Sequence, residues 1–209
     1  MAIYKGNKKV VAVYKGSTPI NKIYKGVTIV FQKSGGGGNT HLIEGTATRN
    51  FNLKINNQKI PITIDADGKW FYDTDDKITS LYRAFYGQSA VTSVDLSNLD
   101  LTGISTKEMF QSASKITSIK FNNTKSMKLA NVAKMFSGCS ALVSLDLSSF
   151  DTSNISKPWF TSSMFENCTS LSTIKCTQTF KDWCIRNQDM IQLPTAMREG
   201  GSGTWEIVV

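Results

Sequence analysis

The chain has 209 residues and a mass of 23.1 kDa, a length that fits one modest domain or two small ones and excludes a large multidomain enzyme. Hydrophobic residues make up 40% and charged residues 19%, so most of the chain is expected to fold. The net charge of +8 is concentrated in residues 1–34, which hold seven lysines and no acid, whereas residues 35–209 hold 17 basic and 16 acidic side chains. Nucleic-acid binding is therefore not favoured, and the basic segment is expected to dock on an acidic partner or to be solvated.

The first residues contain no apolar run that would serve as a signal-peptide core, and no stretch of the sequence is apolar enough to span a membrane. We therefore expect a protein that is made without an export signal and that reaches a surface only through another machine or on lysis. No membrane partner is expected.

Residues 1–34 contain a motif that recurs every ten residues. Short β-type runs separate its copies, which predicts a small β-meander that ends each strand at a Lys-Gly turn. So short a meander buries too little surface to be stable alone, and we expect it to dock on a partner or to oligomerise. The docking residues are Tyr4, Lys5, Gly6, Tyr14, Lys15, Gly16, Tyr24, Lys25 and Gly26. Residues 35–40 form a glycine-rich linker.

Residues 41–80 alternate as strands and predict a small β-hairpin unit. Strands are expected over residues 51–55, 60–64 and 69–72. The last two flank Asp65-Ala66-Asp67-Gly68, and its Asp-Gly pair favours the positive φ of a hairpin turn. The segment lacks the further oxygen ligands of an EF-hand loop, so no calcium site is expected.

Residues 81–199 carry a second repeat, which is anchored by a phenylalanine in each unit. These phenylalanines are Phe85, Phe110, Phe136 and Phe165, at spacings of 25, 26 and 29 residues. Each is followed by an L-x-x-L-x-L pattern, as in Leu142, Leu145 and Leu147, which is typical of leucine-rich repeats. We expect four stacked coils, each with a short helix or turn and a strand of a parallel sheet. A terminal cap helix follows around residues 180–185, and a glycine-rich turn and a final strand occupy residues 200–209.

The segment MFSGCSALVSLDLSSFDTSN, residues 135–154, resembles the BspA-like leucine-rich repeat, whose units read MFxxCxxLxxLDLSxFDTSN. The resemblance covers about half of the chain, and Gln88 and Ala113 replace the repeat cysteine in the first two units. It implies surface adhesins of bacteria or proteins of their phages. The Tyr-Lys-Gly segment with its glycine tether resembles the N-terminal part of small phage virion proteins.

Together the two resemblances imply a structural phage virion protein, a head or tail fibre or decoration protein on the virion surface. Residues 1–34 would bind other virion proteins, and the repeats would bind a bacterial surface glycan or protein. A homo-oligomer is expected, with a trimer as the guess that phage fibres suggest. The first alternative is a bacterial surface or secreted adhesin, and the second is a glycan-degrading enzyme.

Two groups of residues are candidates for ligand binding. Asp95, Lys120, Asp146 and Lys175 occupy equivalent positions in successive units and predict a ladder of alternating charge on the exposed strand face. The ladder either binds a receptor or only fixes register and solubility. Trp159 and Phe160 lie in an insertion of the third unit, where they form a contact site or fold back over the edge of the repeats.

The sequence does not favour catalysis, and no cofactor or metal is expected. The single histidine, His41, follows the glycine tether, an improbable place for a catalytic triad or metal centre. Asp73, Asp75 and Asp76 are the only candidates for glycan cleavage. The four cysteines lack CxxC spacing, so a zinc site or disulfide scaffold is not indicated.

The fold class predicted from these patterns is mainly β with α+β repeats. It comprises an N-terminal β-meander, a small β unit, and a four-coil leucine-rich-repeat solenoid with a C-terminal cap.

Overall fold

The computed structural model describes residues 3–5, 8–10, 41–74, 76–124 and 126–208. The strands are short: β1 (Ile3–Lys5), β2 (Lys8–Val10), β3 (Ile43–Ala47), β4 (Phe51–Ile55), β5 (Gln58–Ile62), β6 (Lys69–Tyr72), β7 (Val91–Asp95), β8 (Ser118–Lys120), β9 (Met127–Lys128), β10 (Ser144–Asp146), β11 (Phe150–Asp151), β12 (Thr173–Thr177) and β13 (Thr204–Val208). The described residues hold one α-helix, α1 (Gln178–Arg186), and two 3₁₀ turns, η1 (Pro158–Phe160) and η2 (Thr195–Met197).

Strands β1 and β2 form an antiparallel pair in which Tyr4 lies opposite Lys9. Of the predicted docking residues, Tyr4 and Lys5 belong to β1. The others, Gly6, Tyr14, Lys15, Gly16, Tyr24, Lys25 and Gly26, lie outside the described residues, as does the linker at 35–40. The docking segment therefore stays a prediction.

Strand β3 joins the small β unit to the first repeat unit. It pairs antiparallel with β6 on one side and with β7 on the other, and β7 pairs parallel with β8. The approach of β3 to β7 is close, because a Cβ added at Gly45 would lie 2.0 Å from the Ser93 carbonyl oxygen. Only glycine fits there. One buried hydrophobic cluster extends from Ile43 to Met197, so the two parts share a core.

The hairpin of the small β unit differs from the one predicted. Strand β4 pairs antiparallel with β5 around Asn56 and Asn57, which both have positive φ and so supply the turn that a two-residue hairpin needs. The Asp-Gly turn forms, with Gly68 at a φ of 76°. It connects β5 to β6, which belong to different sheets, and the prediction of a hairpin there was wrong.

The repeat units stack through their phenylalanines. The four rings are fully buried, and successive centroids are 5.2, 5.9 and 5.7 Å apart with the ring planes within 12° of parallel. We call this set, Phe85, Phe110, Phe136 and Phe165, the phenylalanine column. Each ring sits in a turn that holds a left-handed residue two positions earlier, namely Arg83, Glu108, Lys134 and Ser163. The backbone of one turn donates to the next, as in the bond from the Phe85 N–H to the Met109 carbonyl at 2.7 Å.

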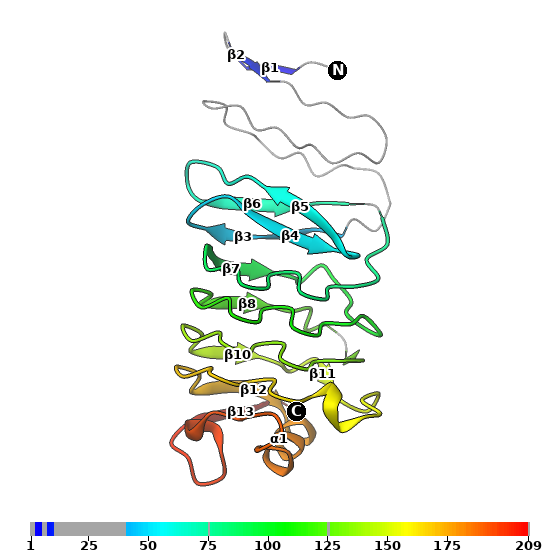
Figure 1. The fold of residues 1–209 in the computed structure, drawn as a ribbon, viewed down its shortest axis with the longest axis vertical. Coiled ribbons are helices and arrows are strands. Elements are labelled where there is room, and N and C mark those ends of the chain that lie inside the picture. The colour runs from blue at the N-terminus through cyan, green and yellow to red at the C-terminus, as the bar shows by residue number, and fades with distance from the viewer. Residues whose placement is uncertain (1–2, 6–7, 11–40, 75, 125, 209) are drawn as a thin grey trace.

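The predicted four-coil leucine-rich-repeat solenoid is wrong. The described part of the chain is mainly β, as expected. Its strands, however, divide into small sheets, with orders β1-β2, β6-β3-β7-β8, β4-β5, β11-β9 and β10-β12-β13. No single parallel sheet runs through the described units, and the helix α1 follows the repeats instead of recurring within them. Figure 1 shows β7, β8, β10, β12 and β13 one below another along the long axis, but β8 and β10 are not paired.

Phe121 lies at the break between β8 and β10. This residue takes the position that Leu96 and Leu147 hold in the neighbouring units, directly after the strand. Its larger ring is buried edge-on against Phe136 at 6.2 Å and Phe150 at 4.9 Å. Strands β8 and β10 have three residues each and could make only a few ladder hydrogen bonds with each other.

The C-terminal end of the stack is closed by α1 and β13. The hydroxyl oxygen of Thr177 caps α1 by accepting the Phe180 N–H at 3.2 Å, as N-cap threonines do. Phe180 and Cys184 bury one face of the helix. Strand β13 pairs parallel with β12, with Glu206 beside Lys175, and the indole N–H of Trp205 donates to the Met197 carbonyl at 3.2 Å.

Candidate binding surfaces

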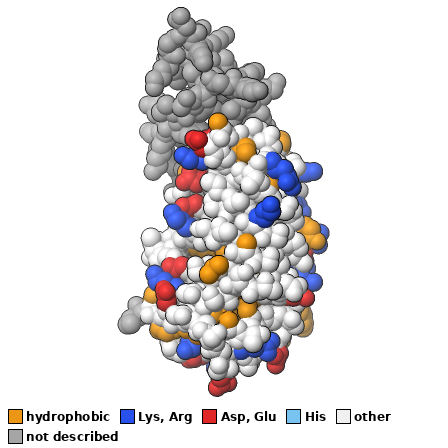
Figure 2. Space-filling view, turned by 90° about the vertical axis from the view of Figure 1, so that its left-hand side faces the viewer, with side chains coloured by type: hydrophobic (Ala, Val, Ile, Leu, Met, Phe, Trp, Pro, Cys, Tyr) orange, Lys and Arg blue, Asp and Glu red, His pale blue; other side chains and the backbone are white. Residues whose placement is uncertain are grey.

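The charge ladder forms as two separate ion pairs. The Lys120 ammonium lies 3.3 Å from the Asp95 carboxylate, and that of Lys175 lies 3.2 Å from Asp146. The gap between the pairs coincides with the break between β8 and β10. Figure 2 shows acidic and basic side chains close together in a column along one margin of the molecule. Since each charge has a local partner, this row supplies little net field for a charged ligand.

The two aspartates of this row are held in turns by serine. Burial by itself raises the pKa of Asp95, but hydrogen bonds from the Ser97 hydroxyl and N–H and from Lys120 outweigh it and hold the pKa below its ordinary value. The same holds for Asp146, with Ser148 and Lys175 as its partners. The Asp-x-Ser turn therefore holds each carboxylate through bonds that do not involve the lysine from the next unit.

Trp159 is the most exposed large hydrophobic side chain in the described part of the chain, at 61%. It lies in η1, within the insertion of the third unit, and the Lys157 ammonium lies 5.1 Å from its ring centre. Phe160 is half-buried, with its ring edge-on to Trp159 at 6.3 Å. Of the two placements predicted for this loop, the exposed one is found for Trp159.

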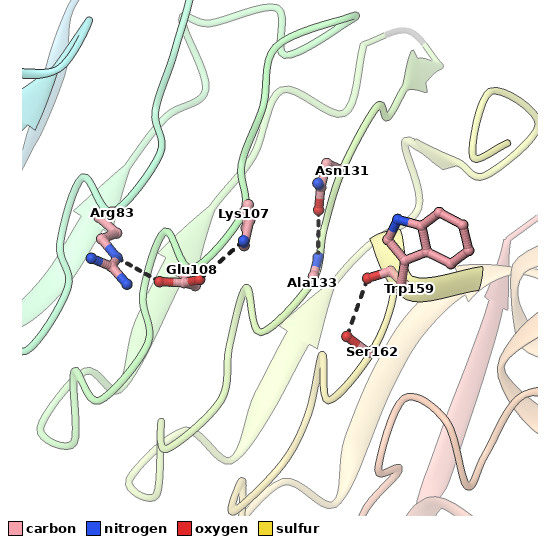
Figure 3. A network of polar contacts seen from close by, with 7 residues as sticks. All are labelled: Arg83, Lys107, Glu108, Asn131, Ala133, Trp159 and Ser162. Atoms are coloured by element: carbon pink, nitrogen blue, oxygen red, sulfur yellow. Dashed lines mark hydrogen bonds and ion pairs between the residues drawn. The ribbon is translucent and has the colours of Figure 1, made fainter. Parts of the chain in front are cut away.

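The backbone around Trp159 is firmly held. The Val132 N–H donates to the Phe160 carbonyl at 2.8 Å, which ties the loop to the preceding unit. The buried Thr161 hydroxyl donates to the Pro158 carbonyl at 2.7 Å, and the Ser162 hydroxyl donates to the Trp159 carbonyl at 3.1 Å, as Figure 3 shows. The indole is thus presented from a rigid turn, and binding to it would cost little ordering of the loop.

Sequence reasoning missed a cluster of tyrosines and cations on the first two units. Arg83 and Lys107 converge on the buried carboxylate of Glu108, with N–O distances of 2.5 and 3.5 Å (Figure 3). The Arg83 guanidinium also lies 4.8 Å from the ring centre of Tyr86, and Lys54 lies 4.8 Å from that of Tyr82. The hydrogen bond to Glu108 raises the pKa of Arg83 above its ordinary value.

This tyrosine–cation cluster could have been found from the repeat register. Arg83 and Glu108 stand 25 residues apart, each two positions before a column phenylalanine. Equivalent positions of stacked units are neighbours, so opposite charges there predict an ion pair. Because the carboxylate already has two cations around it, the cluster serves mainly to join the units.

The cysteines are buried thiols, and all four are free. The Cys139 and Cys168 thiols donate to the carbonyls of Phe110 and Phe136 at 3.2 and 3.0 Å. Burial raises the pKa of Cys168 to about 12 and that of Cys176 to about 11. Thiols held in this way are poor nucleophiles.

The acidic residues considered for glycan cleavage lie after β6. Asp73 and Asp76 are exposed, and Asp75 lies outside the described residues. Within the part of the chain that the structure describes, no three His, Cys, Asp or Glu side chains form a group that could hold a metal ion. In the same part, no helix has the length and apolar character needed to cross a membrane.

A family described as "Mycoplasma protein of unknown function, DUF285" matches residues 79–197, more than half of the chain. The chain belongs to this family. The DUF285 segment holds the phenylalanine column, the Trp159 loop and α1, whereas β3 to β6 and β13 lie outside it. Neither the curated proteins nor the solved structures gave a match. The DUF285 assignment thus places the repeats in a family and leaves their activity open.

Proposed function

We propose that this protein is a structural, non-enzymatic component of a phage particle, a fibre or decoration protein on the virion surface. It attaches to other virion proteins through residues 1–34 and displays its repeats to bacterial surface polymers. The proposal builds on the sequence resemblances and on the exposed, rigidly held Trp159. An exposed tryptophan beside a lysine is the kind of anchor that dominates binding interfaces.

The distribution of charge supports a division of labour along the chain. Residues 1–34 carry seven lysines and no acid, whereas the rest of the chain carries a net charge of about +1. The basic segment therefore suits an acidic particle surface, and the nearly neutral repeats do not compete for it. Several copies on one particle multiply weak contacts into strong attachment.

The contact role of Trp159 is tested with the variant Trp159→Ala. We expect its binding to intact bacterial cells, measured by co-sedimentation of fluorescently labelled protein across a panel of species, to fall at least about tenfold, as for an interface anchor. The matched control is Val143→Ala, which shortens another exposed apolar side chain, 54% exposed. Equal binding by both variants would remove Trp159 from the proposal.

The assembly role of residues 1–34 is tested by light scattering of the full chain beside a chain that lacks residues 1–38. All of the buried core described lies between Ile43 and Met197, so the shorter chain is expected to fold. An oligomeric full chain and a monomeric truncation support the fibre proposal. Monomers in both cases count against self-assembly through this segment.

A further inference from the structure

An open groove lies where the repeat pattern stops, beside β11. It has a volume of about 510 Å³ and is lined by Asn123, Thr124 and Ser126, by residues 148–153, and by the start of α1. In the described chain β11 pairs only with β9. The fourth unit continues from β12 into α1 instead of laying a strand beside β11, and this departure creates the groove. Its volume falls in the range of small-molecule sites.

Ser149, in the wall of this groove, has an unsatisfied hydroxyl. The residue is 5% exposed, and its oxygen has no hydrogen-bond partner within the described structure. The neighbouring Ser148 differs, since its hydroxyl donates to Asp146 at 2.6 Å. A buried hydroxyl without a partner is unfavourable, and since the Ser149 oxygen makes no hydrogen bond within the described structure, rotation about χ1 to meet a ligand would break none.

Asp151 supplies an acceptor on the same wall. Its Oδ1 accepts the Ser153 N–H at 2.8 Å, while its Oδ2 lies 3.5 Å from the Ser126 hydroxyl, a long contact that leaves it capacity for another donor. The hydrogen bond from the Ser153 N–H is the main reason that the pKa of Asp151 lies below its ordinary value. The carboxylate is therefore ionised at neutral pH and accepts hydroxyl protons well.

The start of α1 supplies donors on the opposite side. Thr177 and Thr179 line the groove, and the N–H group of Thr179 stands in the first turn of a nine-residue helix, where no intrahelical carbonyl serves it. Phe150 and Phe180 form an apolar floor, with their rings edge-on at 6.1 Å. The groove thus combines donors, acceptors and an aromatic base.

This combination selects one class of ligand. The helix start and the hydroxyls would suit an anion, but the Asp151 carboxylate lines the groove and repels one, while Lys128, whose charge acts on Asp151, is not among the lining residues. One carboxylate with hydroxyls is too few hard ligands for a cation. We propose that the groove binds a neutral sugar unit of a bacterial surface polysaccharide, with Asp151 accepting a sugar hydroxyl and Ser149 and the first turn of α1 donating to sugar oxygens. This inference rests on the proposed display function.

The test is amide NMR of the full chain titrated with the methyl glycosides of glucose, galactose, mannose and N-acetylglucosamine, and separately with inorganic phosphate. We expect saturable shifts at residues 149–153 and 177–179 with at least one sugar, and none with phosphate. Ser149→Ala and Asp151→Asn should each weaken that sugar at least about tenfold, the size expected for a lost hydrogen bond to a charged or buried group. A structural role for the Ser149 hydroxyl would instead lower the melting temperature, which this proposal expects to stay unchanged or rise.

The matched control is Asp100→Asn. Asp100 accepts the Thr102 N–H at 2.9 Å in the first unit, as Asp151 accepts that of Ser153 in the third, but it lies away from the groove. Its variant should bind sugar normally. No saturable shift with any sugar, shifts confined to another surface, or binding of phosphate instead would overturn the proposal. A monomeric chain that binds sugar would leave the groove assignment standing while counting against assembly through residues 1–34.

Discussion

The phenylalanine column and the row of strands run through the same units, yet only the column is continuous. The column stacks ring on ring from Phe85 to Phe165, whereas the strand pairing stops after β8 and resumes at β10. A ring stack tolerates small shifts because dispersion and hydrophobic contact are not directional, but ladder hydrogen bonds are lost with misalignment. The phenylalanine column and the backbone hydrogen bonds between successive turns, rather than the strand pairing, therefore connect all four described repeat units.

The sharpest way to break the column is Phe110→Ala. Phe110 is fully buried between Phe85 and Phe136, and such a truncation costs about 3–5 kcal/mol of unfolding free energy. Urea denaturation followed by circular dichroism measures the loss. The exposed Tyr86→Ala serves as a control, with a much smaller change expected. A loss in Phe110→Ala no larger than in the control would show that the strands hold the units together.

Glu108→Gln tests a link between the first two repeat units that belongs neither to the phenylalanine column nor to the row of strands. The buried carboxylate has Arg83 and Lys107 as partners, and neutralising it costs about 1–3 kcal/mol, since a charged hydrogen bond is lost while the amide still donates and accepts. Equilibrium denaturation again gives the value. Glu166→Gln is the comparison on the later units, where the Ser137 hydroxyl contacts Glu166 at 3.3 Å. A larger loss there than at Glu108 would contradict the ranking.

Cys139→Ala tests a contact between the phenylalanine column and a neighbouring buried thiol. The substitution removes the sulfur and its bond to the Phe110 carbonyl, and it should lower the unfolding free energy by about 1 kcal/mol, the centre of the range for single substitutions. The wild-type thiols should also resist alkylation until the protein unfolds, because burial raises their pKa values. Rapid labelling of Cys139 in the folded protein would mean that the column opens locally.

The smallest expected effect is the pH dependence of the unfolding free energy that comes from the ion pairs on the row of strands. The folded-state pKa values of Asp95 and Asp146 lie below their unfolded values, so their stabilisation is present above about pH 4, the ordinary aspartate pKa, and is lost as the pH falls through the folded values. Since the pairs are partly exposed, each contributes at most about 1 kcal/mol. Comparing Asp95→Asn and Asp146→Asn with wild type between neutral and acidic pH should show a flatter pH dependence in both variants. An unchanged slope would mean that the turns, rather than the charges, matter.

Sequence periodicity identified the four repeat units through their nearly equally spaced phenylalanines, but it did not predict that the four rings stack on one another. It also did not predict the break in the sheet between β8 and β10, because the pairing of strands of three residues depends on packing that a residue pattern does not contain. The exposed Trp159 was one of two placements that the insertion allowed. The groove beside β11 could not be predicted, because it arises where the chain continues from β12 into α1. Whether these residues form a helix or a further strand is decided by packing, which the sequence pattern does not show. The tyrosine–cation cluster was readable from the register and was missed.

The antiparallel strand β3 limits where repeat units can be gained or lost during evolution. Successive units are joined by backbone hydrogen bonds between their turns and by stacked phenylalanines, so a duplicated unit can be inserted between existing ones with these contacts preserved. At β3 this rule ends, because the next strand must run in the opposite direction, and Gly45 leaves no room for a side chain against Ser93. Relatives with more or fewer units are therefore expected to gain or lose them after β7, and to keep a residue without a side chain at the position of Gly45.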